Sequence, residues 1–289
     1  MTTTTTTTTH QDSLADTGGP VGRFLRYPVT WMLVGVVAVG LVAGLTAQST
    51  PVTVVPVLGA GLAVLVYRAV MRFVARRRTP ELAGRRAVPE ALSGAAIGLG
   101  YVVVSASVIA ALGGYTFRWA DVDVLGVVVP VLAVTCGAAV TEELMFRGFV
   151  LQALERLLGS WIALPITALL FGVTHLFNPG ATLWSALAVA VEAGGILGAA
   201  FLWRRNLWFA IGLHFAWNST VALLGITVSG HAATGLLAVD VSGPPLLTGG
   251  AFGIEGSLVT VALSVLLTVP MLLLARRRGT LLPPARTRP

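Results

Sequence analysis

Residues 124–157 read VLGVVVPVLAVTCGAAVTEELMFRGFVLQALERL, an apolar run that nevertheless holds two adjacent glutamates and an arginine near its middle. A helix that crosses a bilayer needs about 20 mostly apolar residues. This run is longer than one crossing, so part of it should tilt or extend beyond the lipid. Seven more apolar runs accompany it, at about 29–47, 52–74, 91–112, 160–177, 182–203, 207–227 and 254–275. The sequence therefore predicts an all-α, polytopic transmembrane helical bundle with about eight spans.

The composition excludes an ordinary soluble domain and gives the bundle a direction. Hydrophobic residues make up 55% of the chain and charged residues 11%, whereas soluble domains have about a quarter of their residues charged. All 19 basic residues are arginines, and in an eight-span topology Arg118 alone falls in an outer loop, which leaves 18 inside. Basic residues gather on the cytoplasmic side of membrane proteins. We therefore expect both termini in the cytoplasm, a multi-pass protein of the cell membrane, and no nucleic-acid partner.

The chain divides into four predicted regions. Residues 1–22 form a threonine-rich tail that cannot build a core and is expected to be disordered. Residues 23–123 hold the first three spans, 124–275 a catalytic bundle of the other five, and 276–289 a basic cytoplasmic tail. The only cysteine, Cys136, lies in an apolar run and permits neither a disulfide nor a thiolate metal site.

Three spans carry polar side chains that are costly in lipid and usually mark function. They are Glu142, Glu143 and Arg147 in the fourth span, His175 in the fifth, and His214 with Asn218 in the seventh. A tight turn around Gly159 should make spans four and five an antiparallel hairpin. Glu142 and His175 lie almost equally far from that turn, so the hairpin should bring them to one height. His214 and Asn218 are four residues apart and share a helix face at a similar depth.

The two glutamates should do different work. Glu143 and Arg147 stand at i and i+4, the spacing of an ion pair on one helix face. Glu142 points about 100° away and has no such partner. A carboxylate in that position suits a general base that takes a proton from water. The alternative is that all these polar groups only form hydrogen bonds between helices.

The motifs resemble those of a known family. Glu-Glu-x-x-x-Arg at 142–147, Phe-x-x-x-His at 171–175 and His-x-x-x-Asn at 214–218 are similar, in order and spacing, to the three motifs of the CAAX protease and bacteriocin-processing (Abi) family of intramembrane endopeptidases. The resemblance covers about residues 120–230. It implies hydrolysis of membrane-embedded or membrane-anchored protein substrates, in the manner of the type II CAAX prenyl proteases.

Residue by residue, the resemblance implies that Glu142 activates water with help from His175, and that His214 and Asn218 stabilise the oxyanion. Glu143, Arg147 and Phe171 would support the site. No cofactor is expected on this reading. The alternative chemistry is a zinc site, for which Glu142, His175 and His214 would supply one oxygen and two nitrogens. The arginine-only usage and the richness in Gly and Ala suggest a prokaryotic origin.

Two other classes of function stay open at this stage. A secondary transporter would also hold polar groups at the bilayer midplane, and Glu192 beside Gly194 and Gly195 would be its coupling site. A hydrogen bond from Glu192 to a neighbouring helix is the preferred interpretation of that residue. A catalytically silent immunity or scaffolding protein of the same fold is the second class. His231 and Asp240 fall in an outer loop and are not candidates.

Overall fold

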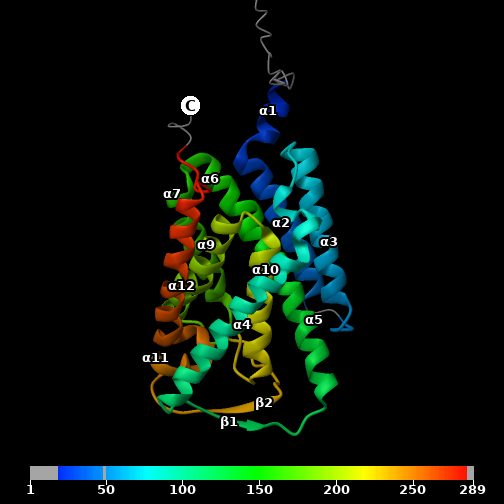
Figure 1. Cartoon of the computed structure of the whole chain (residues 1–289). Coiled ribbons are helices and arrows are strands. Elements are labelled where there is room, and N and C mark those ends of the chain that lie inside the picture. Colours follow the sequence, from blue (N-terminus) through cyan, green and yellow to red (C-terminus); the bar gives the residue numbers. More distant parts are fainter. Residues whose placement is uncertain (1–18, 48–49, 285–289) are drawn as a thin grey trace, which may run out of the picture.

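The structure, a computed structural model, describes residues 19–47 and 50–284. Most of the predicted threonine-rich tail and the last five residues of the basic tail lie outside the described residues. Within these residues, seven helices are long and apolar enough to cross a membrane, and an eighth apolar helix, α10, is shorter, with 17 residues. The helices stand side by side, and α1 and the end of α12 lie at the same end of the bundle (Figure 1). The chain is a polytopic helical membrane protein, as its sequence predicts.

Eight apolar segments correspond to the predicted spans. They are α2 (Pro28–Thr46); α3 (Val55–Ala69) with η1 (Val70–Val74); α4 (Ala87–Ala111); α5 (Val124–Glu143) with η4 (Leu144–Leu151) and α6 (Gln152–Leu158); α7 (Ser160–Thr174) with η5 (His175–Phe177); α8 (Leu183–Val189) with η6 (Ala190–Gly194) and α9 (Gly195–Arg204); α10 (Leu207–Leu223); and α12 (Leu258–Arg277). Short elements connect them: α1 (Pro20–Arg26), η2 (Pro80–Leu82), η3 (Gly84–Arg86), α11 (Pro245–Thr248), η7 (Gly250–Phe252) and η8 (Ile254–Gly256).

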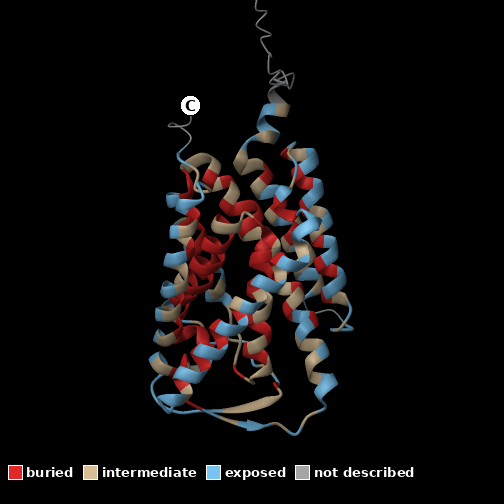
Figure 2. Cartoon of the chain, viewed as in Figure 1, coloured by how far each residue is buried: buried red, intermediate tan, exposed pale blue. Residues whose placement is uncertain are grey.

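One span forms the centre of the bundle. In Leu183–Arg204, 78% of the most apolar 18-residue stretch is buried inside the protein, against 17% of that in the peripheral span Pro28–Thr46. Buried residues gather in the interior of the helix cluster, while the outer helices expose apolar side chains to their surroundings (Figure 2). A helix that is apolar all round belongs in lipid or in a core. How far a residue is buried therefore depends on where its helix stands in the bundle, and not on an amphipathic pattern along the helix.

Three of the long helices contain a π-helical segment, namely η1, η4 and η6. The predicted overlong fourth run is one of them, because α5, η4 and α6 follow one another without a break from Val124 to Leu158. A π turn changes the backbone hydrogen-bond register and is frequent at functional sites. Here η4 begins directly after the two glutamates of the first motif.

Close backbone contact fixes α10 against α4. A Cβ atom on Gly98 of α4 would lie 2.2 Å from the carbonyl oxygen of Leu213 in α10. Only glycine permits that approach, as is usual where membrane helices pack tightly. Leu213 directly precedes His214, so this contact sets the position of the histidine. The contact joins the predicted 23–123 and 124–275 regions, whose division stays a prediction.

A small sheet that the sequence analysis did not predict closes one end of the bundle. Strands β1 (Tyr115–Trp119) and β2 (Leu237–Val241) pair antiparallel, with Tyr115 opposite Val241 and Trp119 opposite Leu237. Both lie at the end opposite α1 (Figure 1). The two strands are far apart in the sequence, so the residues of one strand do not indicate which segment it pairs with. Arg118 and Asp240 form a diagonal ion pair of 3.6 Å across the two strands, and both side chains are largely exposed.

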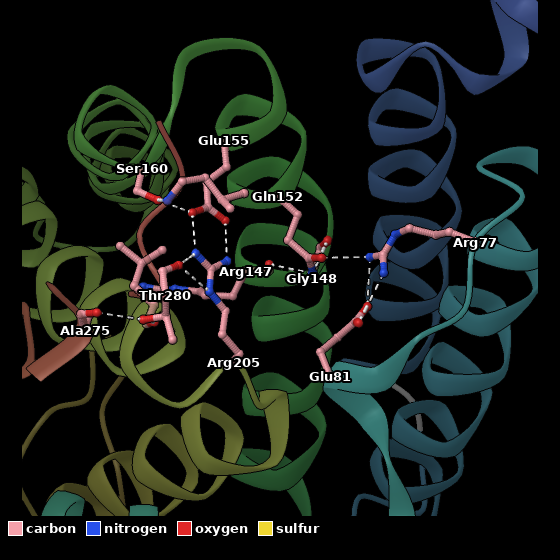
Figure 3. A network of polar contacts seen from close by, with 12 residues as sticks. Arg77, Glu81, Arg147, Gly148, Gln152, Glu155, Ser160, Arg205, Ala275 and Thr280 are labelled. Atoms are coloured by element: carbon pink, nitrogen blue, oxygen red, sulfur yellow. Dashed lines mark hydrogen bonds and ion pairs between the residues drawn. The ribbon is translucent and has the colours of Figure 1, made fainter. Parts of the chain in front are cut away.

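The arginine-rich end is tied together by Glu155. Its two oxygens accept hydrogen bonds of 2.8 and 2.7 Å from Nη2 and Nη1 of Arg205, in the α9–α10 turn. Ser160, just after the predicted turn at Gly159, also donates to Glu155. Arg205 reaches the carbonyl of Thr280 beyond α12 as well (Figure 3). Three chain reversals are thereby joined around one buried carboxylate.

Candidate active site

The predicted pair of Glu143 and Arg147 lies at the centre of the molecule. Nη1 of Arg147 donates to Oε1 of Glu143 at 2.8 Å, and both residues are fully buried. The same oxygen accepts a hydrogen bond of 2.9 Å from Nδ1 of His214. One carboxylate oxygen thus joins the first motif to the third. A buried charge is costly unless it is paired and hydrogen-bonded, and this arrangement supplies both.

Arg147 also reaches the central helix. Its Nη2 donates to the carbonyl of Ala193 at 2.7 Å, with Gly194 O at 3.4 Å. Both carbonyls belong to the π-helical segment η6, where the changed register leaves carbonyl oxygens available to outside donors. Arg147 therefore holds three elements, η4, α10 through Glu143, and η6, in fixed relation.

His214 has a defined orientation. Because Glu143 is paired with Arg147 and accepts only, Nδ1 of His214 carries the proton of their hydrogen bond. Nε2 then faces Oε2 of Glu142 at 3.9 Å. The Glu142 side chain is 29% exposed, whereas that of Glu143 is fully buried. Glu142 is therefore the accessible carboxylate of the pair, as its position on the other helix face predicts.

His175 is oriented in the same way by backbone. Its Nδ1 lies 2.8 Å from the carbonyl oxygen of Phe171, which can only accept, so the proton sits on Nδ1. The Nε2 atom is then free to accept a hydrogen bond. His175 is the first residue of the 3-10 turn η5 at the end of α7 and is half-buried.

The Phe171 ring joins the three motifs. Its centroid lies 4.8 Å from the Arg147 guanidinium carbon, 4.7 Å from the His175 ring and 6.3 Å from the His214 ring. A cation over an aromatic face is stabilised by the ring quadrupole. This contact set gives a physical reason for the aromatic residue at the start of the second motif.

Asn218 lies one turn beyond His214 on α10 and is buried. Within the described part of the chain its side-chain amide has no hydrogen-bond partner. The next residue, Ser219, bonds Thr135 of α5 at 2.7 Å and fixes this part of α10. A buried amide without a partner in the protein is available to a bound substrate.

One carboxylate near the site was missed by the sequence analysis. Glu255 of η8 is buried, and its Oε2 accepts hydrogen bonds from the backbone and hydroxyl of Ser229 at 2.6 and 2.8 Å. Burial raises the pKa of Glu255, while Ser229 and the charges of His175 and His214 act to lower it. Asn178, just after η5, donates to the carbonyl of Ser229 at 2.9 Å. Glu255 lies in no motif, so nothing in the sequence indicated its proximity.

Other polar residues of the spans have structural roles. Glu192 accepts hydrogen bonds of 3.1 Å from Tyr101 and 2.7 Å from Thr260, on α4 and α12. This agrees with the interhelical hydrogen bond preferred for that residue. Trp217 is buried and packs on the Tyr101 ring at 4.6 Å.

The zinc alternative stays a prediction. Among the residues that the structure describes, no three His, Cys, Asp or Glu side chains are grouped to hold a metal ion. The Nδ1 atoms of both histidines are engaged by Phe171 and Glu143, which leaves the Nε2 atom of each ring available. Glu142, His175 and His214, the residues named for zinc, are not such a group.

The fold and the site together define a polytopic helical membrane protein with a buried Glu–Arg–His centre supplied by the fourth and seventh spans. The model of the family described as type II CAAX prenyl endopeptidase Rce1-like matches residues 124–220, about a third of the chain. That segment contains all four predicted catalytic residues and all three supporting ones. Over this segment the chain is similar to the Rce1-like family of CAAX endopeptidases. Searches of curated proteins and of solved structures found no match.

Proposed function

We propose that this protein is an intramembrane endopeptidase that cleaves membrane-anchored or membrane-embedded protein substrates with a water activated by Glu142. The observation that carries the proposal is the pair of carboxylates. Glu143 is already bound by Arg147 and His214, whereas Glu142 is accessible and lies 3.9 Å from His214 Nε2. A general base must be reachable by its proton donor, and Glu142 meets that requirement.

Each residue has a place in the reaction. His175, with its proton on Nδ1, accepts a hydrogen bond from the water through Nε2 and orients it. Glu142 takes the proton as the water oxygen attacks the scissile carbonyl carbon. The carbonyl oxygen becomes an oxyanion that is stabilised by the Asn218 amide and by the Nε2–H of His214, which acts as an imidazolium with protons on both ring nitrogens. Glu142 then returns the proton to the leaving amide nitrogen, and the C–N bond breaks.

The remaining groups hold this arrangement. Arg147 holds Glu143 in place through their ion pair, and Glu143 in turn holds the His214 ring. A carboxylate that orients a histidine in this way recurs in hydrolases of unrelated folds. Pre-oriented oxyanion donors are typically worth about 3–4 kcal/mol of barrier.

The orientation and location are part of the proposal. Arg118 is the one arginine of the described residues in the sheet at the far end of the bundle. More arginines lie at the opposite end of the bundle, which carries α1 and the C-terminal end of α12. We place that end in the cytoplasm of a prokaryotic cell, with the protein in the plasma membrane and without a metal cofactor.

Cleavage profiling tests the function. Purified protein in lipid nanodiscs is incubated with a library of membrane-anchored peptides, and products are identified by mass spectrometry. Wild type should cut a defined subset, and Glu142→Ala should cut none. Asp121→Ala, which removes an exposed loop carboxylate, is the matched control and should behave as wild type. A chain that cut nothing would be a silent relative of the endopeptidases.

A further inference from the structure

A basic hollow lies at the end of the second span, far along the chain from the catalytic motifs. It has a volume of about 760 Å³ and is lined by Arg68, Arg72, Phe73, Arg76, Arg77, Arg78 and Thr79. Five of the seven lining residues are arginines. The positive-inside tendency explains arginines beyond a span, but it does not require them to surround one hollow.

The local backbone builds this hollow. The segment η1 ends the helix as a π turn, and Arg76 follows in the left-handed region with φ 51°. The chain then reverses, so that the Arg77 amide donates to the Met71 carbonyl at 2.9 Å. A non-glycine residue in that region is uncommon and is retained where its surroundings determine it. The reversal returns the Arg76–Thr79 segment over the end of the span.

One arginine anchors the wall. Arg77 donates to both oxygens of Glu81, at 3.1 and 2.8 Å, and to Oε1 of Gln152 at 2.8 Å (Figure 3). Glu81 also accepts from Tyr67 at 2.5 Å. This buried network joins the loop to α3 and α6. The loop is thereby held in place.

The other arginines of the hollow are not neutralised by acidic side chains. Arg72, Arg76 and Arg78 are exposed and have no acidic partner among the described residues. Arg72 lies beside Phe73, 5.9 Å from its ring. The only acid on this loop, Glu81, is already paired with Arg77. The hollow therefore has an excess of guanidinium groups, which suit the oxygens of a phosphate.

An apolar strip leads directly to it. Leu58, Leu62 and Leu65 are exposed and follow the spacing of one helix face, which Ala69 and Arg72 continue. Phe73, 70% exposed, stands at the boundary. A diacyl lipid has a matching order of groups, because its apolar acyl chains are followed by a charged headgroup as the leucines are followed by the arginines. A free phosphate would make no use of the strip.

We infer that this hollow binds the phosphate headgroup of an anionic glycerophospholipid, whose acyl chains lie along the exposed leucines of α3. The site is independent of the proposed proteolysis. It would bind lipid in a catalytically silent chain as well.

The test is native mass spectrometry of the full chain, released from nanodiscs of equal parts phosphatidylglycerol and phosphatidylcholine. Wild type should retain phosphatidylglycerol in preference. The triple variant Arg72→Gln, Arg76→Gln, Arg78→Gln should bind it about tenfold to a hundredfold more weakly. The matched control is Arg276→Gln, Arg277→Gln, Arg278→Gln, which removes three exposed arginines of α12 and its end. It should keep the preference.

Three outcomes would overturn the inference. Equal loss in both triple variants would mean that only total charge matters. No preference in the wild type would mean that the hollow binds no lipid. Displacement of the lipid by an equal concentration of glycerol 3-phosphate would make it a soluble-phosphate site. If the triple variant does not fold, Arg78→Glu alone, on the exposed loop, should still weaken retention, and unchanged retention would count against the site.

Discussion

Glu142 and Glu143 are neighbours in the chain but differ in what their loss removes. Glu142→Gln should abolish cleavage with little change in thermal stability, because the amide keeps the shape but cannot take a proton. Glu143→Gln should lose activity and also about 3–5 kcal/mol of stability, since Arg147 would keep its buried charge without a carboxylate. Turnover and thermal unfolding in detergent measure the two effects. Near-normal turnover by Glu142→Gln would show that another group is the base.

Asn218 separates the glutamate mechanism from the zinc alternative. If its amide stabilises the oxyanion, Asn218→Ala should lower kcat by about 10²–10³ with KM nearly unchanged. The variant should fold normally, because the amide has no hydrogen-bond partner in the described part of the chain. A metal would polarise the carbonyl itself, and the loss would then be milder.

Treatment with a chelator tests independently whether the mechanism needs a metal. Prolonged chelator treatment should leave full activity, with no stoichiometric metal by elemental analysis. One zinc per chain, with activity lost on its removal and restored on its return, would contradict the metal-free mechanism. Glu142, His175 and His214 would then be the expected ligands.

Among the elements, η8 is joined to the loop around Ser229 and interacts with the two histidines that we propose to be catalytic. Glu255 is near enough to His175, His214 and Glu192 for their charges to interact, and it accepts two hydrogen bonds from Ser229. Its pKa is raised above the ordinary value of 4.5, mainly by burial. The folded state therefore holds this proton more tightly than the unfolded chain does. The resulting stabilisation is present below pH 4.5 and is lost as pH rises through the raised pKa.

The consequence is a pH dependence assigned to one residue. The unfolding temperature of wild type should fall, relative to that of Glu255→Gln, as pH increases from 4.5 through the raised pKa. Differential scanning fluorimetry across that range measures the difference. Asp240→Asn, on the exposed β2 strand, is the control and should follow wild type. Parallel curves for Glu255→Gln and wild type would exclude Glu255 as the titrating group.

For the whole molecule, the even number of apolar segments brings α1 and the end of α12 to one end, opposite β1 and β2 (Figure 1). In a Cys136→Ala background, cysteines at Asp121 and Asp240 should react with an impermeant maleimide added to intact cells. Cysteines at Pro80 and Arg277 should react only after lysis. All four positions are exposed. The opposite pattern would reverse the proposed orientation and put the basic hollow on the outer face.

Much of this architecture could be predicted because membrane spans are encoded locally. A run of about 20 apolar residues is sufficient for a helix in lipid, so the span positions followed from hydropathy. Likewise, the i, i+4 spacing alone predicted the Glu143–Arg147 pair, and the Gly159 turn made a hairpin of α5–α6 and α7. The arrangement of motif residues on successive helices was enough to indicate the family.

Contacts between distant segments were decided only by the tertiary structure. Neither spacing nor composition indicates that His214 and Arg147 bind the same oxygen of Glu143. The same is true of the carbonyls of η6 that accept hydrogen bonds from Arg147 and of the position of Glu255 near both histidines. Helical periodicity specifies which face a residue occupies but not which helix meets that face. Those neighbours depend on close packing, such as that of Gly98 against Leu213, which forms only when the whole bundle assembles.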